Sequence, residues 1–277
     1  METIILNVNS RFRDKSLYPN AGDFFMDITQ DIRNIIHMRL TSLEIPNISY
    51  MFSDDKNNNS FKLTVNSRTF TISLGNGNYT SDSLIDALTT ELDTINTTTG
   101  ADLAISISVI TGKLTITCSQ SFTINFSRTG DTMYSNINYF LGYTQDTYTG
   151  KSIEAESVIN LLGTNYFFIK INNIQNIYDH YVPNAFAKVI INTSKFAVQF
   201  EDYDNFVSKD KQFRSPQNLK KLHIQIVDHY GKVMDFFNHD ISFTLELGYI
   251  YDLELYKRIH NSGIPNGDDR LKYLNFR

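Results

Sequence analysis

The sequence predicts a mainly β protein: an antiparallel jelly-roll β-sandwich with a small inserted α+β domain. Three observations favour this fold class. The 277 residues include 16 Tyr and 20 Phe but only 5 Pro, and aromatic residues favour strands. From Ile241 to Leu255 every odd position is apolar, while Ser242, Thr244 and Glu246 are polar, which indicates a strand with one buried face. Between residues 52 and 150 the residue pattern changes, and this segment contains the one strong helix signal of the sequence.

The first fifty residues read as three strands. They are expected at Thr3–Val8, Phe24–Thr29 and Ile35–Ile45. In the third strand Ile36, Met38 and Leu40 share one parity. Leu43 and Ile45 take the other parity, so we expect a β-bulge at Thr41-Ser42 that keeps one face buried. A long bulged strand that turns a corner between sheets suits a jelly roll.

Short strands are expected again after residue 150. Asn, Gly, Pro or Asp residues bound the segments Asn165–Ile171, Ala185–Ile191, Phe196–Phe200 and Lys221–Val227. In the last of these, Leu222, Ile224 and Ile226 should point inward. With the strands at the two chain ends, about eight or nine strands lie outside the middle segment, which is the number that a jelly roll needs.

Residues 52–150 are expected to form the inserted α+β domain, and residues 1–51 and 151–277 the sandwich. Thr80 or Ser81 should cap the helix, whose apolar stripe consists of Leu84, Leu88, Leu92 and Ile95. The strands expected around it are Phe61–Val65, Thr69–Leu74, Ala104–Ile110, Lys113–Cys118, Phe122–Phe126 and Asn136–Gly142. An insertion is tolerated where both of its ends emerge on one surface. Two tandem β domains are the alternative.

Charge and cysteine content exclude several function classes. A formal charge of −5 and a pI near 5.7 argue against a protein whose main task is to bind nucleic-acid phosphates. The densest basic run is expected to be a solvated loop; it consists of Lys209, Lys211, Arg214, Lys220 and Lys221. The single cysteine, Cys118, allows no intramolecular disulfide. No signal peptide or transmembrane run is visible, so we expect a soluble protein made in a reducing compartment.

A search for catalytic chemistry finds no motif. Cys118 lies in a strand pattern without a base, and the six histidines form no metal-binding spacing. The chain is therefore expected not to be an enzyme and to need no cofactor. Asp228, His229, His239 and Asp240 flank one expected hairpin and are weak candidates for a metal site, although ordinary turn residues are the simpler interpretation.

Several short motifs occur in a recognisable order along the chain. They are Ser10-Arg11-Phe12-Arg13-Asp14, Tyr18-Pro19-Asn20, Ile45-Pro46-Asn47, Gly77-Asn78-Tyr79-Thr80, Phe140-Leu141-Gly142-Tyr143, Ala185-Phe186-Ala187-Lys188-Val189, Lys221-Leu222-His223-Ile224, Asp228-His229-Tyr230-Gly231 and Ser242-Phe243-Thr244-Leu245-Glu246-Leu247. This order resembles jelly-roll minor capsid and penton (vertex) proteins of large eukaryotic DNA viruses, including giant viruses, and of virophages. The resemblance implies a virion structural protein. It does not distinguish a vertex subunit from a protein that cements the shell from inside.

The resemblance also implies partners and a location. We expect a symmetric oligomer, with a pentamer favoured, in contact with the major capsid protein and other shell proteins. The protein would be synthesised in the host cytoplasm and reside in the virion. Arg11, Arg13 and Asp14 could contact a neighbouring subunit through bidentate pairing, but an internal salt bridge that orders the first turn is equally open.

A binding module is the alternative function. A carbohydrate- or receptor-binding β-sandwich on a virion surface appendage would need aromatic platforms beside carboxylates. Tyr178, Tyr181, Tyr203 and Asp204 could offer such a platform, whereas the lack of Trp counts against it.

Overall fold

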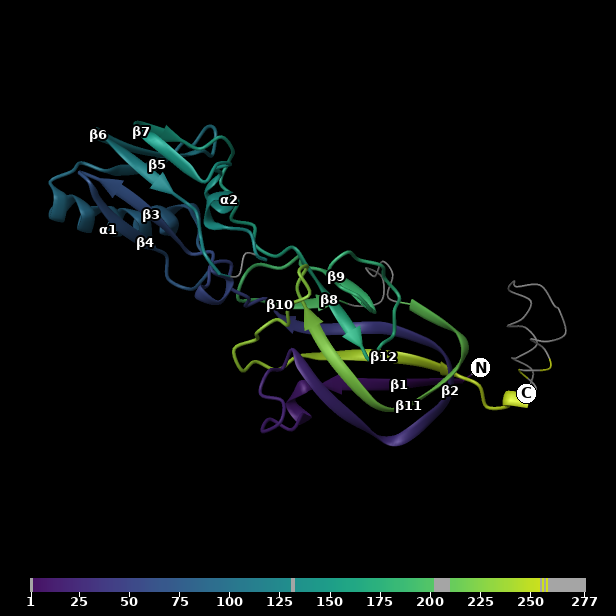
Figure 1. The fold of residues 1–277 in the computed structure, drawn as a ribbon. Coiled ribbons are helices and arrows are strands. Elements are labelled where there is room, and N and C mark those ends of the chain that lie inside the picture. The colour runs from purple at the N-terminus through teal and green to yellow at the C-terminus, as the bar shows by residue number, and fades with distance from the viewer. Residues whose placement is uncertain (1, 131–132, 202–209, 255, 257, 259–277) are drawn as a thin grey trace. The chain divides into compact units, whose positions relative to one another are not determined.

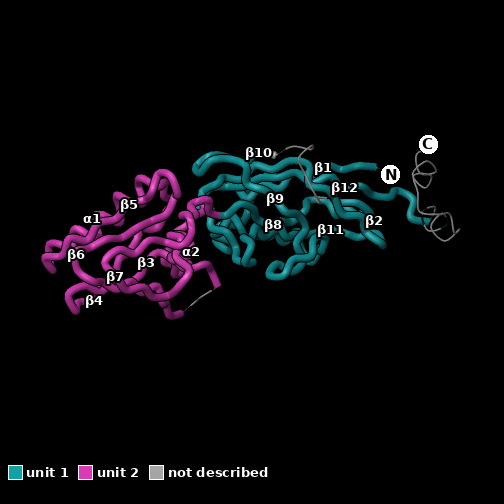
Figure 2. The backbone as a smooth tube through the Cα atoms, turned by 90° about the horizontal axis from the view of Figure 1, so that it is seen from above, with its two compact units in different colours: residues 1–48, 164–277 teal, residues 49–163 magenta. Residues whose placement is uncertain are grey.

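The computed structural model describes residues 2–130, 133–201, 210–254, 256 and 258. It is mainly β, with antiparallel sheets in a sandwich-like arrangement, which confirms the predicted fold class (Figure 1). The chain divides into two compact units, coloured separately in Figure 2. Unit 1 contains residues 1–48 and 164–277, and unit 2 contains residues 49–163. The sequence placed the second boundary at residue 150, which lies inside the last strand of unit 2.

In unit 1 the described residues form one sheet of seven antiparallel strands. Its order is β1-β12-β2-β11-β8-β9, and β10 also pairs with β2. The strand bounds are β1 Glu2–Asn9, β2 Asp23–Pro46, β8 Tyr166–Ile171, β9 Ala187–Ile190, β10 Val198–Glu201, β11 Asp210–Val227 and β12 Ser242–Tyr249. The first and last strands of the described residues therefore pair in the sheet, since Glu2 of β1 lies opposite Tyr249 of β12.

Strand β2 differs from the sequence prediction because it is a single strand of 24 residues. The expected break between Thr29 and Ile35 does not occur. Asn34 takes a positive φ of 57° there, a conformation that asparagine tolerates better than most residues, so the chain bends while the strand continues. Strand β11 pairs with β2 from Asp23 to Arg39, with several register shifts, and β12 pairs with β2 from Ile35 to Glu44. One strand thus serves both layers of the sandwich.

The predicted bulge in β2 is confirmed. Thr244 of β12 pairs with Ser42 and the next residue, Leu245, pairs with Leu40, so Thr41 is the extra residue. As a result the apolar positions on both sides of the bulge face the same core: Met38, Leu40, Leu43 and Ile45 are all buried. Ile36 is only half-buried, and Ile35 is buried in its place.

Strand β12 confirms the alternating pattern over part of its predicted length. Phe243, Leu245 and Leu247 are buried, and the polar residues between them are half-buried. The pattern fails beyond Gly248, where the register with β2 shifts. The strand ends at Tyr249, and Tyr251 is 85% exposed. Leu255 lies outside the described residues.

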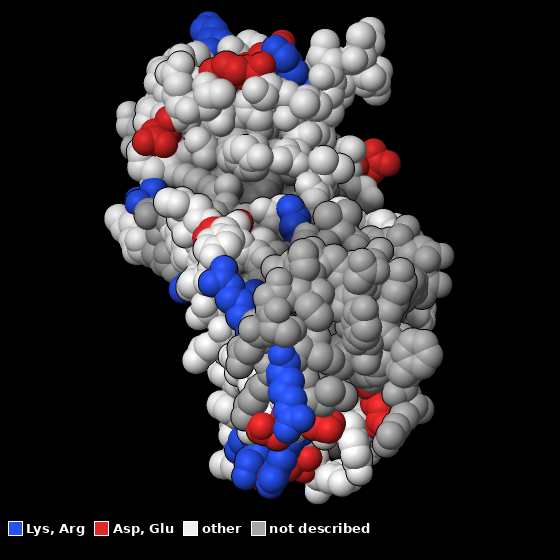
Figure 3. Space-filling view, turned by 90° about the vertical axis from the view of Figure 1, so that its right-hand side faces the viewer, with Lys and Arg blue, Asp and Glu red and all other residues white. Residues whose placement is uncertain are grey.

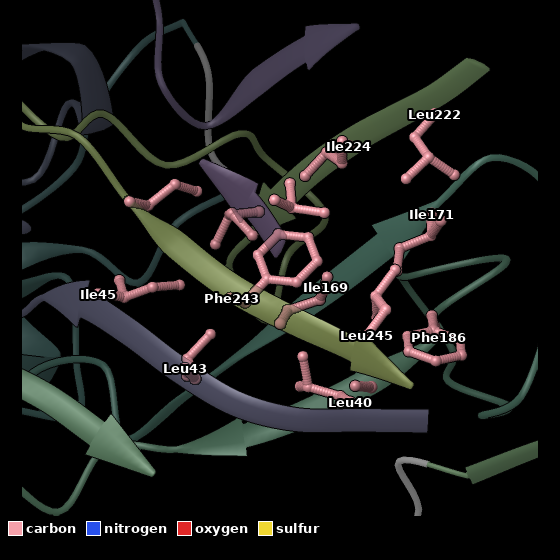
Figure 4. Packing of buried hydrophobic residues seen from close by; sticks show 14 of the residues in the cluster. Leu40, Leu43, Ile45, Ile169, Ile171, Phe186, Leu222, Ile224, Phe243 and Leu245 are labelled. Carbon is pink, nitrogen blue, oxygen red and sulfur yellow. The ribbon is translucent and has the colours of Figure 1, made fainter. Parts of the chain in front are cut away.

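Figure 4 shows how the two layers of unit 1 share a core. Side chains from β2 and β12, such as Leu43 and Phe243, point towards Ile169 of β8 and Ile224 of β11. The predicted inward residues Leu222, Ile224 and Ile226 are all fully buried. Apolar burial of this extent is the main stabilising contribution to such a sandwich.

In unit 2 one helix packs against a five-stranded antiparallel sheet. The sheet order is β4-β3-β6-β5, and β7 pairs with β6. The bounds are β3 Ser60–Val65, β4 Arg68–Ser73, α1 Ser81–Thr99, β5 Ala104–Ile107, β6 Leu114–Asn125, α2 Ile137–Leu141 and β7 Thr147–Glu154. Thr80 caps α1 in a reciprocal capping box with Ser83, and the predicted stripe from Leu84 to Ile95 is buried against the sheet.

Three details of unit 2 differ from the prediction. The expected strands Lys113–Cys118 and Phe122–Phe126 are parts of one bulged strand, β6. The segment Asn136–Gly142 contains the short helix α2 instead of a strand. Gly142 ends this helix at φ +87°, and an added Cβ would lie 2.2 Å from the carbonyl oxygen of Ser157, so only glycine fits. Strand β7 was not predicted at all.

No helix among the described residues is long and apolar enough to cross a membrane.

Candidate assembly surfaces

The turn after β1 is built around one buried arginine. Asn9 caps a 3-10 turn at Ser10–Phe12, and its side-chain oxygen accepts the backbone N–H of Arg11 at 2.9 Å. The chain then reverses towards β2. Arg13 lies at the centre of this reversal, and only 2% of its side chain is exposed.

The Arg13 guanidinium is fully engaged within the chain. Its Nη1 donates to the Asp240 carboxylate at 2.7 Å and to the carbonyl of Ser10 at 2.8 Å. Its Nε and Nη2 donate to the carbonyls of Tyr18 and Pro19, at 2.8 and 2.9 Å. Of the two roles that the sequence left open for Arg13, the structure shows the internal salt bridge, which ties the N-terminal turn to the residue that precedes β12 by two positions.

Asp240 is the acidic partner in this contact. Its Oδ1 also accepts the Ser10 hydroxyl at 3.1 Å. Burial would raise the pKa of the Asp240 carboxyl, but the hydrogen bonds from Arg13 and Ser10 outweigh it and hold the pKa below the ordinary value. The carboxylate therefore stays ionised and keeps the buried guanidinium paired.

The same turn presents apolar side chains outward. Phe12 is 81% exposed and Leu17 is 67% exposed, and Arg11 and Asp14 are exposed beside them. The Asp14 carboxylate accepts the backbone N–H and the hydroxyl of Ser16, which lowers its pKa below the ordinary value. An assembly role for Arg11 and Asp14 stays a prediction. The sequence analysis missed Phe12 and Leu17, because nothing in the local pattern shows that Arg13 points inward and therefore that its neighbours point outward.

A second exposed apolar stripe runs along β10 and includes a residue just before it. Phe196, Val198 and Phe200 alternate on one side of the chain and are 72%, 43% and 66% exposed. Gln199 between them is buried, and its side-chain oxygen accepts the backbone N–H of Asn192. Contiguous apolar side chains that no core requires usually mark a contact surface.

The third exposed apolar group is a pair of residues at the tip of the β5–β6 hairpin in unit 2. Val109 and Ile110 are 100% and 91% exposed. The expected strand Ala104–Ile110 stops at Ile107, and the chain reverses through Gly112 at φ +67°. The apolar pair therefore caps the turn instead of continuing the sheet.

The four weak metal candidates do not form a site. The Asp228 carboxylate accepts the backbone N–H groups of Tyr230 and Lys232 at 2.9 and 3.0 Å, which is a turn function. His239 Nδ1 lies 3.1 Å from the carbonyl of Phe236, and Asp240 pairs with Arg13. Within the described ranges, no three His, Cys, Asp or Glu side chains gather closely enough to hold a metal ion.

The basic run is a strand and not the expected loop. Lys211, Arg214, Lys220 and Lys221 belong to β11, and Lys209 lies outside the described residues. Lys220 lies 3.1 Å from Asp31 of β2, and Lys221 lies 3.7 Å from Asp27. Figure 3 shows Lys and Arg side chains beside Asp and Glu side chains at one end of the face in view. Because Lys220 and Lys221 are paired with aspartates of β2, the run is a poor match for a phosphate backbone.

Cys118 is a buried strand residue of β6, as expected. Its Sγ lies 3.1 Å from the Asp102 carboxylate, which also accepts the backbone N–H and the hydroxyl of Ser119. These hydrogen bonds lower the pKa of Asp102 to about 2. The thiol donates to a structural carboxylate here, so its contact is a structural one.

Of the comparisons with known proteins, the likeness to a solved structure supports the fold. Residues 1–130 match the model of a family of unknown function (DUF5901). No curated protein sequence matches the chain. The crystal structure of the mavirus penton protein is similar in fold, with a TM-score of 0.51 over 90% of this chain and 100% of that chain. Only 11% of the residues are identical, so the likeness is one of fold.

Proposed function

We propose that this chain is a virion structural protein: a jelly-roll capsid component that acts by self-assembly, and specifically the vertex (penton) subunit. The observation that carries the proposal is the likeness in fold to the mavirus penton protein, which extends over the whole of that chain. The order of motifs along the sequence supports the same proposal independently of the structure.

The surface of the chain supports an assembly role. Three exposed apolar groups lie at a turn, beside a strand and at a hairpin tip, which are the places where one subunit can reach another. The N-terminal turn is the best suited, because Arg13 fixes it and the exposed Phe12 and Leu17 need no rearrangement before contact. The partners are further copies of this chain, in a pentamer, together with the major capsid protein and other shell proteins. Its place is the capsid of a virion, after synthesis in the host cytoplasm.

We also propose that the chain has no turnover chemistry. The described residues that could have served as nucleophile or metal ligands, such as Cys118 and Asp228, are engaged in structural hydrogen bonds.

Electron cryo-microscopy of particles of the virus that encodes the chain tests this proposal. Density for the chain at the five-fold axes is expected. Density beneath the facets would assign it a cementing role instead, and absence from the particles would overturn the structural role altogether.

A solution experiment tests the surface. The double variant Phe12→Ser/Leu17→Ser should fold with an unchanged melting temperature, since both side chains are exposed, but should lose incorporation into assembled particles. The matched control is Tyr251→Ser, which removes a side chain that is 85% exposed outside the turn and should leave incorporation intact.

A further inference from the structure

Five aromatic rings in unit 1 form a continuous row that the sandwich core does not use. The row runs Tyr166, His229, Tyr230, Tyr181, His180, and successive ring centroids are 6.0, 4.0, 6.3 and 4.6 Å apart. The rings come from three separate segments: the start of β8, the loop between β8 and β9, and the turn after β11. Side chains up to 64 positions apart in the sequence are thus brought together at one end of the unit.

Two turns hold the row rigidly. The Asp179 carboxylate accepts the backbone N–H groups of Tyr181 and Val182 at 3.0 and 3.1 Å. The Asp228 carboxylate fixes the turn that carries His229 and Tyr230 in the same way. The two turns also touch: a Cβ on Gly231, at φ +81°, would lie 2.9 Å from the carbonyl oxygen of Tyr181. The rings are therefore positioned before any ligand arrives, which lowers the entropic cost of binding.

The row is accessible although a small core lies beneath it. Phe168, Val182, Ala185 and Val227 form that core and are buried. Above it, Tyr181 is 57% exposed, His180 is exposed, and Tyr166, His229 and Tyr230 are half-buried. Folding alone would bury large aromatic side chains more completely, since their apolar area is a major source of stability. Their partial exposure in a pre-formed row indicates a binding surface.

We propose that this aromatic row binds an uncharged oligosaccharide. Pyranose rings present C–H groups on their faces, and these groups stack on the electron-rich faces of Tyr and His rings. The hydroxyl groups at the edges of the sugar need hydrogen-bond partners, which the phenol hydroxyls of Tyr166 and Tyr181 and the imidazole of His180 can supply. Sites of this kind combine aromatic walls with a few polar groups that fix orientation.

Lys188 completes the polar edge of the row. Its Nζ lies 3.8 Å from the centroid of the Tyr166 ring, in a cation–π contact. An ammonium group carries three donors, so it can bind a sugar hydroxyl from that position. Burial raises the pKa of the Tyr166 hydroxyl, and the charge of Asp179 adds to this effect, so the phenol remains a donor at neutral pH.

Charge decides between a sugar and the other ligands that stack on aromatic rings. Nucleic acids also stack on such rows, but they require a positively charged groove along the backbone. Here the described charges beside the row are mixed, with Asp179 and Asp228 in the loop and the turn and Lys188 over Tyr166, and the chain as a whole carries −5. A phosphate backbone is disfavoured by this balance, whereas an uncharged sugar is not affected by it.

Titration of the full chain with neutral hexa-oligosaccharides tests the proposal. The probes are cellohexaose, laminarihexaose, maltohexaose and chitohexaose, followed by saturation-transfer NMR and isothermal titration calorimetry. We expect at least one of them to bind, and Tyr181→Ala to weaken that binding about tenfold or more, the scale of one lost stacking contact. Tyr181→Phe should retain more affinity than Tyr181→Ala, because the ring remains.

Tyr178→Ala is the matched control. Tyr178 lies in the same loop and is 88% exposed, but it is not one of the five rings. Its loss should leave affinity unchanged, and the melting temperatures of the variants should agree. The proposal is overturned if none of the four probes binds, if Tyr181→Ala binds as well as the original chain, or if Tyr181→Ala instead abolishes self-association in sedimentation velocity. Each of these outcomes is independent of where the chain lies in a particle.

Discussion

The two units close their cores in different ways. In unit 1 the first of the described strands pairs with the last of them, and the buried Arg13 pairs with Asp240, 227 positions away. In unit 2 the strands pair with partners inside residues 49–163, beginning with the hairpin between β3 and β4. Unit 1 therefore needs both β1 and the distant β12 before the described sheet is complete, whereas unit 2 needs neither.

Local signals are correspondingly stronger in unit 2. The turn of its first hairpin has Asn66 and Ser67 at φ values of 50° and 61°, the conformation that suits the twist of two adjacent strands. Helix α1 has a capping box at its start and Gly100 at φ +68° at its end. In unit 1, long-range contacts such as those of Arg13 fix the turns instead. The comparison indicates that unit 2 can fold locally and that unit 1 depends on closing a long loop.

Removal of unit 2 gives the largest expected effect. The prediction is that residues 49–163 replaced by a short Gly/Ser linker leave a soluble β protein, and that residues 49–163 expressed alone also fold. Far-UV circular dichroism with a melting curve measures both. A single cooperative transition in each piece is expected, because each unit has its own apolar core. Complete loss of folding in either piece would mean that the two cores depend on each other.

Truncation of the core of unit 1 should have the next largest effect. Phe243 is 1% exposed between the layers in Figure 4, so Phe243→Ala should lower the free energy of unfolding by roughly 3–5 kcal/mol. Thr244 points to the opposite face and is half-buried, so Thr244→Ala should cost much less. Urea unfolding of both variants measures the difference. Equal losses would show that the outer face of β12 is covered as well.

Loss of the Arg13 contact should lower the free energy of unfolding somewhat less than Phe243→Ala does. Breaking a buried ion pair by removing one partner costs about 3–5 kcal/mol, and the lower end applies to Arg13→Ala because Asp240 is 30% exposed and can recover water. Arg13→Lys should recover only part of the loss, since an ammonium cannot reproduce the four donor contacts of the fork. In the full chain, the loss should lower the stability of the transition assigned to unit 1 and leave that of unit 2 unchanged. A loss confined to the transition of unit 2 would contradict the assignment.

The sequence predicted best where one local pattern decides the structure. The Thr80 cap and the stripe from Leu84 to Ile95 specify α1 without reference to the rest of the chain. The parity change around Thr41 specifies the bulge, because a slip of one residue would expose the whole core face. Strand β7 gave no such pattern: only Ile153 among its eight residues is buried. Strand β2 was divided in the prediction because the polar residues near Asn34 resemble a turn, and the pairing with β11 that keeps the strand continuous lies about 180 residues away.

The surfaces were harder to predict than the core. Arg11 and Arg13 are equivalent in the sequence, yet one is exposed and the other is buried, because the partner of Arg13 is 227 positions away. The aromatic row was hard to predict for the same reason: contacts between segments that are distant in the sequence create it. Tyr181 was recognised as a candidate platform residue, but Tyr166, His229 and Tyr230 become its neighbours only when β8 and β11 pair. Of the other expected members, Tyr178 is exposed in the same loop but is not one of the five rings, and Tyr203 and Asp204 lie outside the described residues.

Acid should weaken both units through one carboxylate in each, and this is the smallest predicted effect. Hydrogen bonds lower the pKa of Asp102 in unit 2 to about 2, from an ordinary value of 3.8. In unit 1, burial raises the pKa of Asp240, but its bonds to Arg13 and Ser10 lower it below the same ordinary value. A folded-state pKa below the unfolded one means that the stabilisation is complete above about pH 4 and is lost as the pH falls through the folded value.

Melting temperatures of the two separate units between pH 5 and pH 2 measure this loss. Each should fall as the pH decreases below the ordinary aspartate value. Asp102→Asn should flatten the pH dependence of unit 2 in this range and leave that of unit 1 unchanged, and Asp240→Asn should do the reverse. Asp86 in α1, for which no hydrogen bond to its carboxylate is seen among the described contacts, is the control: Asp86→Asn should flatten neither curve. If Asp102→Asn left the slope of unit 2 intact, other carboxylates would carry its acid sensitivity, and the contact with Ser119 and Cys118 would be incidental to stability.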